Sequence, residues 1–247
     1  MNYRQQSKKK HGRDKISRRS FLKYTGTIIF VAAGGCYVPQ DKGAGHLVKL
    51  DESSGGIAPS QGYLLVDVRK CQGCTSCMLA CTLVHEGVEN PSLSRIQIIQ
   101  NPFDAFPDDV TIEQCRQCIE PACVEVCPTG ALSANAKFGN VRMIDRTQCI
   151  GCGDCVDACP YTPSRPVVVS DENFDDDLKS RKCDLCAETP YHWEDAGGGP
   201  DGKQACVEVC PVGAIKFTKQ IPLQEGDNGY RVNLRTKNWR KLGYLIN

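Results

Sequence analysis

The placement of cysteine constrains this chain more than any other feature of its sequence. Cysteine makes up 17 of the 247 residues, and all but Cys36 fall into four groups of four. Motif I is Cys71, Cys74, Cys77 and Cys81; motif II is Cys115, Cys118, Cys123 and Cys127; motif III is Cys149, Cys152, Cys155 and Cys159; motif IV is Cys183, Cys186, Cys206 and Cys210. Because aromatic residues are only 7% of the chain, bonds to these thiols are expected to hold the fold together more than a large apolar core.

Motifs I and III have the spacing with which bacterial ferredoxins bind [4Fe–4S] clusters, whereas motif II has four residues and motif IV nineteen between the second and third cysteines. Motif III reads C-x2-C-x2-C-x3-C-P, the bacterial run in which the fourth cysteine binds the other cluster of a two-cluster protein. The first three cysteines form one tight loop, and the fourth is predicted to begin a helix that carries it to the second cluster. Gly73, Gly151 and Gly153 lack side chains, so backbone N–H groups can approach the sulfurs.

Zinc and disulfides are the two other uses of so many thiols. Structural zinc usually binds two separated C-x2-C pairs, whereas motif I places three thiols within residues 71–77. Disulfides are typical of small secreted scaffolds, but pairs at C-x2-C spacing would cross-link little of a fold. The spacing therefore favours iron–sulfur clusters.

The chain also contains an internal duplication. Residues 122–132, ACVEVCPTGAL, recur at 205–215 as ACVEVCPVGAI, and motifs I and III match each other as well. Residues 131–133 and 141–145 flank a Gly139-Asn140 turn, which predicts a hairpin joining motifs II and III. The counterparts of these strands, 63–68 before motif I and 214–217 after motif IV, are predicted to pair with each other. Residues 95–99 and 110–112 are two further predicted strands.

These pairings predict an α+β chain of two nested, bacterial-type two-cluster ferredoxin-like modules with loop insertions. Residues 62–114 and 183–219 hold motifs I and IV, and residues 115–182 hold motifs II and III. The predicted ligand sets are Cys71, Cys74, Cys77 and Cys210; Cys183, Cys186, Cys206 and Cys81; Cys115, Cys118, Cys123 and Cys159; and Cys149, Cys152, Cys155 and Cys127. Four irons per set predict about 16 irons per chain.

No residues in the sequence form a recognisable catalytic constellation. We find no Ser/His/Asp arrangement, phosphate-binding loop or dinucleotide fingerprint in it. A cluster with four cysteine ligands has no open iron position for a substrate, so the chain is predicted to carry electrons without being an enzyme itself. His85 and His192 lie near the motifs, but with sixteen cysteines available they are expected to pack or to face solvent.

The first 36 residues are predicted to be an export signal. Basic residues precede Arg18-Arg19, and the apolar run 27–33 and small residues follow, which resembles a twin-arginine signal peptide. The twin-arginine translocase carries folded proteins, so clusters built in the cytoplasm would travel inside the fold. Cys36 follows small residues, as a lipidated cysteine does, but Ala33 stands where leucine is usual. Lipidation and a spectator thiol near the cleavage site both stay open.

Charge is divided unevenly along the chain. Residues 1–36 carry a net charge of +8 and residues 37–247 a net charge of −7, so the body offers no broad basic surface for nucleic acid.

Residues 37–61 are predicted to be a linker. The tail 220–247 mixes aromatic and basic residues, which fits a partner contact and a surface strand of this chain equally well. The expected location is the periplasm or the outer face of the cytoplasmic membrane, where partners or a lipid would hold the protein.

The order of the four motifs over residues 62–219 resembles the iron–sulfur electron-transfer subunits of dimethyl-sulfoxide-reductase-family molybdenum/tungsten oxidoreductase complexes. This resemblance implies four [4Fe–4S] clusters that relay electrons between a molybdopterin or tungstopterin catalytic subunit and an integral-membrane quinone-linked subunit in anaerobic respiration. Some relatives replace one motif III cysteine and hold a three-iron cluster, whereas Cys152 is present here. Residues 115–132 and 92–98 also resemble the polyferredoxin subunits of tungsten aldehyde oxidoreductases, which is the alternative.

Overall fold

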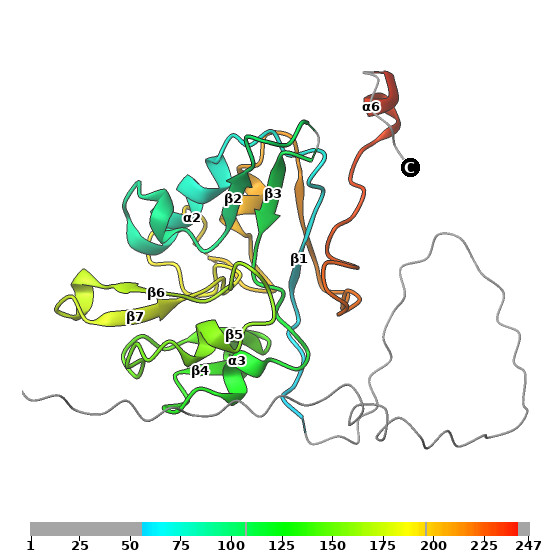
Figure 1. Cartoon of the computed structure of the whole chain (residues 1–247). Coiled ribbons are helices and arrows are strands. Elements are labelled where there is room, and N and C mark those ends of the chain that lie inside the picture. The colour runs from blue at the N-terminus through cyan, green and yellow to red at the C-terminus, as the bar shows by residue number, and fades with distance from the viewer. Residues whose placement is uncertain (1–55, 107, 196, 242–247) are drawn as a thin grey trace, which may run out of the picture. The chain divides into compact units, whose positions relative to one another are not determined.

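Figure 1 shows a computed structural model of the chain, which describes residues 56–106, 108–195 and 197–241. The predicted signal with Arg18, Arg19 and Cys36, and most of the predicted linker, lie outside the described residues. Within the described part, no helix has the length and apolar character needed to cross a bilayer.

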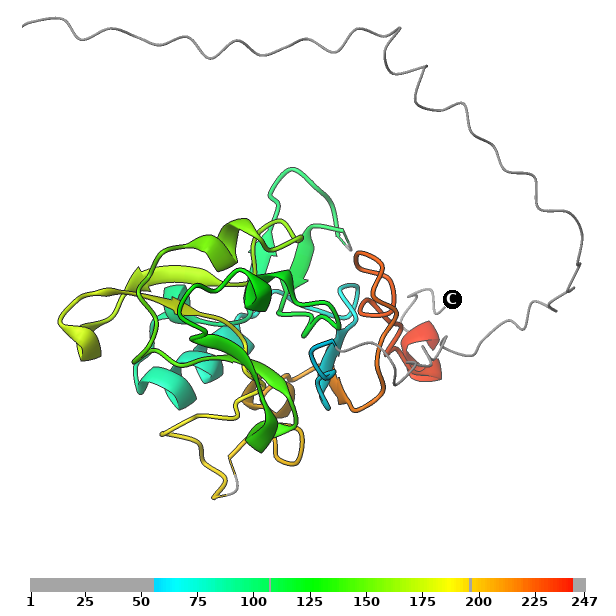
Figure 2. The same ribbon diagram turned by 90° about the horizontal axis from the view of Figure 1, so that it is seen from below.

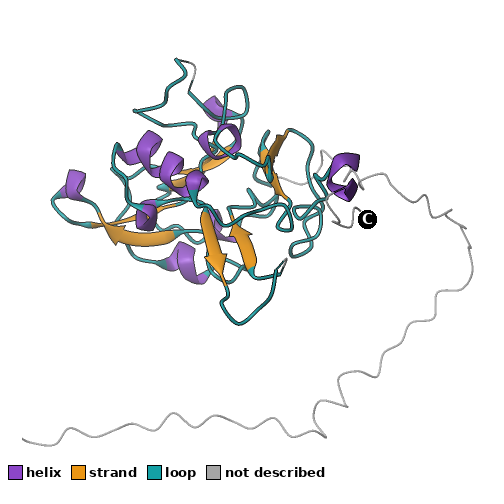
Figure 3. Cartoon of the chain, turned by 90° about the horizontal axis from the view of Figure 1, so that it is seen from above, coloured by secondary structure: helices purple, strands orange, loops and turns teal. Residues whose placement is uncertain are grey.

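Short helices and strands alternate with long loops (Figure 3). The strands are β1 (Tyr63–Val66), β2 (Gln97–Gln100), β3 (Val110–Glu113), β4 (Leu132–Asn135), β5 (Val141–Ile144), β6 (Val167–Ser170), β7 (Leu178–Arg181) and β8 (Ile215–Thr218). The helices are α2 (Ser76–Glu86), α3 (Ala122–Glu125), α4 (Asp154–Asp157), α5 (Ala205–Glu208) and α6 (Lys237–Lys241), with 3-10 turns η1 (Pro91–Leu93), η2 (Ala136–Phe138) and η3 (Glu172–Phe174).

The strand pairs that join the cysteine motifs are those predicted from the duplication. β4 and β5 form an antiparallel hairpin between motifs II and III, with Leu132 opposite Ile144. β1 and β8 pair antiparallel although they are far apart in the sequence, with Val66 opposite Ile215. Both predictions are confirmed. The two copies of the sequence ACVE also form corresponding helices, α3 and α5.

Two further antiparallel hairpins are insertions between the motifs. β2 pairs with β3 between motifs I and II, which confirms the two strands expected there. β6 pairs with β7 between motifs III and IV, and we did not predict this hairpin, although three consecutive valines, 167–169, are a strand signal in the sequence. In Figure 1 the β6–β7 hairpin lies between α2, β2 and β3 on one side and α3, β4 and β5 on the other.

The expected helix start needs a correction. We predicted that the fourth cysteine of each motif begins a helix, but the helix of each motif begins one residue before the third cysteine, as α2 does before Cys77. Cys81 lies inside α2, whereas Cys127, Cys159 and Cys210 lie just beyond α3, α4 and α5. The tight loop thus ends at the second cysteine, and one helical turn separates the third from the fourth.

The buried core combines apolar strand residues with the cysteines themselves. Leu64, Val66, Ile112, Val141 and Met143 belong to one cluster that also contains buried cysteines of motifs I, II and IV. An apolar core this small, built around thiols, is what the composition led us to expect.

The first part of the tail packs on its own chain. Residues 220–235 run beside β1 (Figure 2), and Val232 donates its backbone N–H to the Val66 carbonyl at 2.8 Å. The Tyr230 side chain is fully buried, and its hydroxyl donates to the Arg116 carbonyl at 2.6 Å. The Arg116 guanidinium lies over the Tyr230 ring, 4.7 Å from its centre. For residues 220–235 these contacts favour the surface-strand interpretation over a contact with a partner.

Replacing Tyr230 by alanine is expected to destabilise the protein by about 3–5 kcal/mol, because a buried aromatic side chain leaves a cavity. Tyr230→Phe keeps the ring and loses only the hydroxyl's hydrogen bond, so its cost should be about 1–2 kcal/mol. Chemical unfolding of the anaerobic protein measures both effects. Equal stability of the alanine variant and the unmodified chain would show that the tail is not packed as described.

Candidate metal centres

The fold brings the cysteines of each predicted ligand set together. We number the four sets as sites 1 to 4 in the order in which they neighbour one another in space. Site 1 is Cys71, Cys74, Cys77 and Cys210; site 2 is Cys81, Cys183, Cys186 and Cys206; site 3 is Cys115, Cys118, Cys123 and Cys159; site 4 is Cys127, Cys149, Cys152 and Cys155. The four cysteines of site 2 line one cavity, those of site 3 a second and those of site 4 a third. In each cavity one motif gives three cysteines and its module partner gives the fourth.

The cysteines of site 1 are close enough to influence one another's ionisation. The pKa of Cys77 is raised to about 12, mainly by burial and to a smaller extent by the thiolates of Cys71, Cys210 and Cys74. The motif IV thiol is thus near the motif I thiols, as the predicted set requires.

Contacts between the sets place the sites in the order 1–2–3–4. Cys77 of site 1 acts electrostatically on Cys206 of site 2, and Cys115 of site 3 acts on Cys183 of site 2. Sites 3 and 4 are joined by α3 and α4, which pack against each other. Cys123 of site 3 lies in α3 with Cys127 of site 4 just beyond it, and Cys155 of site 4 lies in α4 with Cys159 of site 3 just beyond it. Cys74 and Cys152 are exposed, whereas all four cysteines of site 2 are buried. Sites 1 and 4 are therefore the two ends, and both reach the surface.

A backbone N–H group points at the fourth cysteine of every motif. Arg95 donates its N–H to Cys81 Sγ and Leu132 donates to Cys127 Sγ, each at 3.3 Å. Arg165 donates to Cys159 Sγ at 3.3 Å, and Ala214 to Cys210 Sγ at 3.2 Å. Hydrogen bonds to cluster sulfurs offset negative charge and tune the potential. The cysteines that cross between motifs are thus held by the chain segment that follows each motif.

The chemistry of the thiols fits a multi-iron cluster. All sixteen described cysteines are free, and burial together with neighbouring thiolates raises the pKa of Cys123 to about 12. Because the thiolate is the form that binds metal, four such groups need a strongly positive partner. Among the described residues, no three His, Cys, Asp or Glu side chains converge closely enough to hold one metal ion. The spacing of three thiols within residues 71–77 remains the observation that favours iron–sulfur clusters over structural zinc.

Buried charges surround site 2. His85 binds Asp184 at 2.9 Å through Nε2 and the Cys81 carbonyl at 2.7 Å through Nδ1, and Arg95 Nη1 binds Asp184 at 2.7 Å. Burial alone would lower the pKa of His85, but Asp184 raises it to about 9. Burial likewise opposes ionisation of Asp184, yet Arg95 and His85 hold its pKa well below its usual range. His85 is therefore buried in an ion network, and His192 stacks on Trp193.

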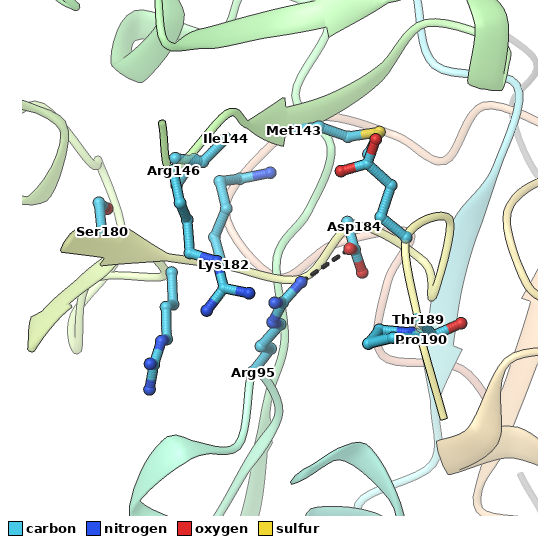
Figure 4. Close-up of a pocket in the computed structure, with 11 residues that line it drawn as sticks. Arg95, Met143, Ile144, Arg146, Ser180, Lys182, Asp184, Thr189 and Pro190 are labelled. Carbon is cyan, nitrogen blue, oxygen red and sulfur yellow. Dashed lines mark hydrogen bonds and ion pairs between the residues drawn. The ribbon is translucent and has the colours of Figure 1, made fainter. Parts of the chain in front are cut away.

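A larger cavity of about 390 Å³ lies beside sites 2 and 3. Figure 4 shows Arg95 joined to Asp184, with Arg146 and Lys182 beside them. Glu86 and Asp171 link the cations of this region, since Arg146 contacts Glu86 at 3.2 Å and Asp171 at 2.9 Å, and Arg181 contacts Asp171 at 3.2 Å. This network ties the end of α2 to the β5–β7 region.

Sequence reasoning identified His85 near motif I, and expected it to pack or to face solvent, but it missed the other charged residues. Lys182 could have been noticed because it directly precedes Cys183. Nothing local marks Glu86 or Asp171, whose partners are distant in the sequence.

Known proteins resemble this chain over its cysteine motifs. Two family models, each described as a 4Fe-4S dicluster domain, match residues 63–128 and 108–220. These matches and the short antiparallel strands confirm an α+β fold with two ferredoxin-like dicluster domains. The division into residues 62–114 with 183–219 and 115–182 stays a prediction, which the β1–β8 and β4–β5 pairings support.

Several curated relatives extend the similarity. Protein NrfC of Escherichia coli (strain K12) is 34% identical over 236 residues, covering 90% of this chain and 92% of that protein. Electron transport protein HydN of the same strain is 33% identical over 178 residues, 66% of this chain and 91% of that protein. The polyferredoxin-like subunit of aliphatic sulfonate oxidoreductase from Pyrococcus furiosus is 36% identical over 149 residues, 60% of this chain and 70% of that protein. The chain therefore belongs to the family of 4Fe-4S dicluster iron–sulfur proteins that includes NrfC and HydN.

Proposed function

We propose that this chain is the electron-transfer subunit of an exported anaerobic respiratory oxidoreductase and binds four [4Fe–4S] clusters at sites 1 to 4. Its partners would be a molybdopterin or tungstopterin catalytic subunit and a membrane quinone-linked subunit. The observation that carries the proposal is the lining of the three cavities, each by three cysteines of one motif and the crossing cysteine of its module partner. Membership of a family that includes electron transport protein HydN supports the same role.

When bound, [4Fe–4S] clusters supply one-electron redox chemistry over potentials that their surroundings set. The chain's own residues fix the sites in a row and direct backbone N–H groups at the crossing cysteines. They bury site 2 and leave Cys74 of site 1 and Cys152 of site 4 exposed. Electrons would therefore enter and leave at sites 1 and 4, and each four-cysteine set leaves no iron open to a substrate.

The alternative partner is a tungsten aldehyde-oxidoreductase-type enzyme, for which the chain would be the polyferredoxin subunit. The similarity to the polyferredoxin-like subunit from Pyrococcus furiosus favours this candidate. In both candidate roles the chain has the same four cluster sites, and the two roles differ only in the catalytic partner. Affinity purification of the tagged chain from its own cells, with metal analysis of the co-purifying subunits, separates the two.

The electron-carrying role is tested by reductive titration of the isolated, anaerobic full chain. We expect reversible uptake of about four electrons, one per cluster. Clusters that keep one oxidation state throughout the titration would mean a purely structural role.

The predicted signal is tested by replacing Arg18 and Arg19 together with lysine, which keeps the charge. We expect loss of export, so that the protein accumulates in the cytoplasm with its clusters intact, because both residues lie in the translocase signal. Cell fractionation measures this. Unchanged export of the double variant would remove the twin-arginine assignment while leaving the cluster sites untouched.

A further inference from the structure

Lys182 is a buried cation at the junction between sites 2 and 3. It directly precedes Cys183 of site 2, and it lines the site 3 cavity together with Cys115 and Cys123. Its exposed fraction is only 3%. A charged lysine is rarely buried this deeply unless the structure compensates it.

The surrounding backbone holds the Lys182 amine in one place. Nζ donates hydrogen bonds to the Arg142 carbonyl and, at 3.1 Å, to the Cys183 carbonyl. In Figure 4 the Lys182 side chain is directed away from Arg95. Both acceptors are buried backbone carbonyls, so the fold provides two hydrogen-bond acceptors for an ammonium group, the form that a lysine side chain ordinarily takes.

The other buried cations nearby each act on one site. Arg142 lies in the field of Cys115, Cys118 and Cys123, all of site 3. Arg95 lies in the field of Cys81 and Cys183, both of site 2, and it is bound to Asp184, which His85 also binds. Lys182 differs because its side chain lines the site 3 cavity while its amine binds the carbonyl of Cys183, a ligand of site 2.

We propose that the Lys182 ammonium is a positive charge shared by sites 2 and 3 that raises the reduction potential of both middle clusters. This inference rests on the proposed function. Reduction adds one negative charge to a cluster, so a fixed positive charge nearby favours the reduced form. The effect is large because the group is buried, where charges are weakly screened. It would ease the electron's passage between the two ferredoxin-like modules.

The test is a redox titration of the anaerobic full chain in which electron paramagnetic resonance measures the reduction of each cluster. Lys182→Gln removes the charge and keeps a hydrogen-bond donor, while Lys182→Arg keeps the charge. Lys179→Gln is the matched control, because Lys179 is also buried, belongs to the adjoining strand β7 and binds the Cys149 carbonyl of site 4 at 2.8 Å. Single variants Cys183→Ser and Cys115→Ser assign the signals of sites 2 and 3.

In Lys182→Gln we expect the ratio of reduced to oxidised cluster at a fixed potential to fall about tenfold at both sites, a shift of about 59 mV for a one-electron couple. Lys182→Arg should stay close to the unmodified chain, and Lys179→Gln should leave sites 2 and 3 unchanged. Unchanged potentials in Lys182→Gln, a shift at one site only, or an equal shift in Lys179→Gln would overturn the proposal.

Iron analysis keeps the proposal testable if Lys182→Gln assembles poorly. Loss of sites 2 and 3 together, with all sites retained in Lys182→Arg, would also support a shared charge. Equal loss in both Lys182 variants would overturn it, because packing rather than charge would then be the requirement. An unmodified chain without four clusters would instead refute the proposed function.

Discussion

Replacing Cys127 by serine is expected to empty site 4 and to leave site 3 filled, so that iron falls from about 16 to about 12 per chain. Cys127 belongs to motif II by sequence, but it lines the cavity of motif III with Cys149, Cys152 and Cys155. Its sulfur accepts the Leu132 N–H at 3.3 Å, which fixes it toward that cavity. Iron analysis and the magnetic resonance signals of the remaining clusters measure the outcome.

Two control variants make this result specific. Cys123→Ser, in the same motif, should empty site 3 instead, because Cys123 lines the other cavity. Cys36→Ser should leave the iron content unchanged, since Cys36 stands outside all four motifs. If Cys127→Ser and Cys123→Ser removed the same cluster, each motif would hold its own cluster and the crossing arrangement would be wrong.

Replacing Glu86 by glutamine is expected to destabilise the protein by about 3–5 kcal/mol. The Glu86 carboxylate is buried at the end of α2 and contacts Arg95 at 3.4 Å, Arg146 at 3.2 Å and Arg181 at 3.7 Å. Removing one partner from a buried ion network leaves the remaining charges uncompensated. Arg181 is itself almost fully buried, so solvent cannot replace the lost carboxylate.

Denaturant unfolding of the anaerobic protein, monitored by the loss of cluster absorbance, measures this effect. Glu194→Gln is the control, because Glu194 pairs with Lys203 at an exposed position and its loss should change little. Similar stability of the Glu86 and Glu194 variants would show that the network does not join α2 to the β5–β7 region.

The cluster sites and the way the strands connect them could be predicted from the sequence, because both depend on local patterns. Cysteine spacing follows from the shape of the ligand loop, and the repeated ACVEVCP segment marks β4 and β8 as equivalent strands. The β6–β7 hairpin left a clear signal in Val167–Val169, which we did not use. The start of each helix before the third cysteine follows from packing around the sites, which spacing alone does not reveal.

The charged surroundings of the sites could not be predicted, because they depend on residues far apart in the chain. Glu86 and Arg181 lie in different motif regions and meet only after α2 and β7 pack together. Lys182 stands next to Cys183 in sequence, yet it also lines the cavity of site 3, whose cysteines come from motifs II and III. Local sequence patterns therefore determine which cysteines form the cluster sites, and tertiary packing sets the electrostatic environment of each site.

Every role proposed for sites 1 to 4 requires that iron–sulfur clusters occupy the four cysteine sets. Iron, zinc and acid-labile sulfide analysis of the anaerobically purified full chain, with resonance spectra before and after reduction, tests this occupancy. We expect about 16 irons and 16 sulfides per chain, on four of each per set, and a paramagnetic signal after reduction. A colourless protein that contains zinc, or one that saturates near half that iron content, would contradict it.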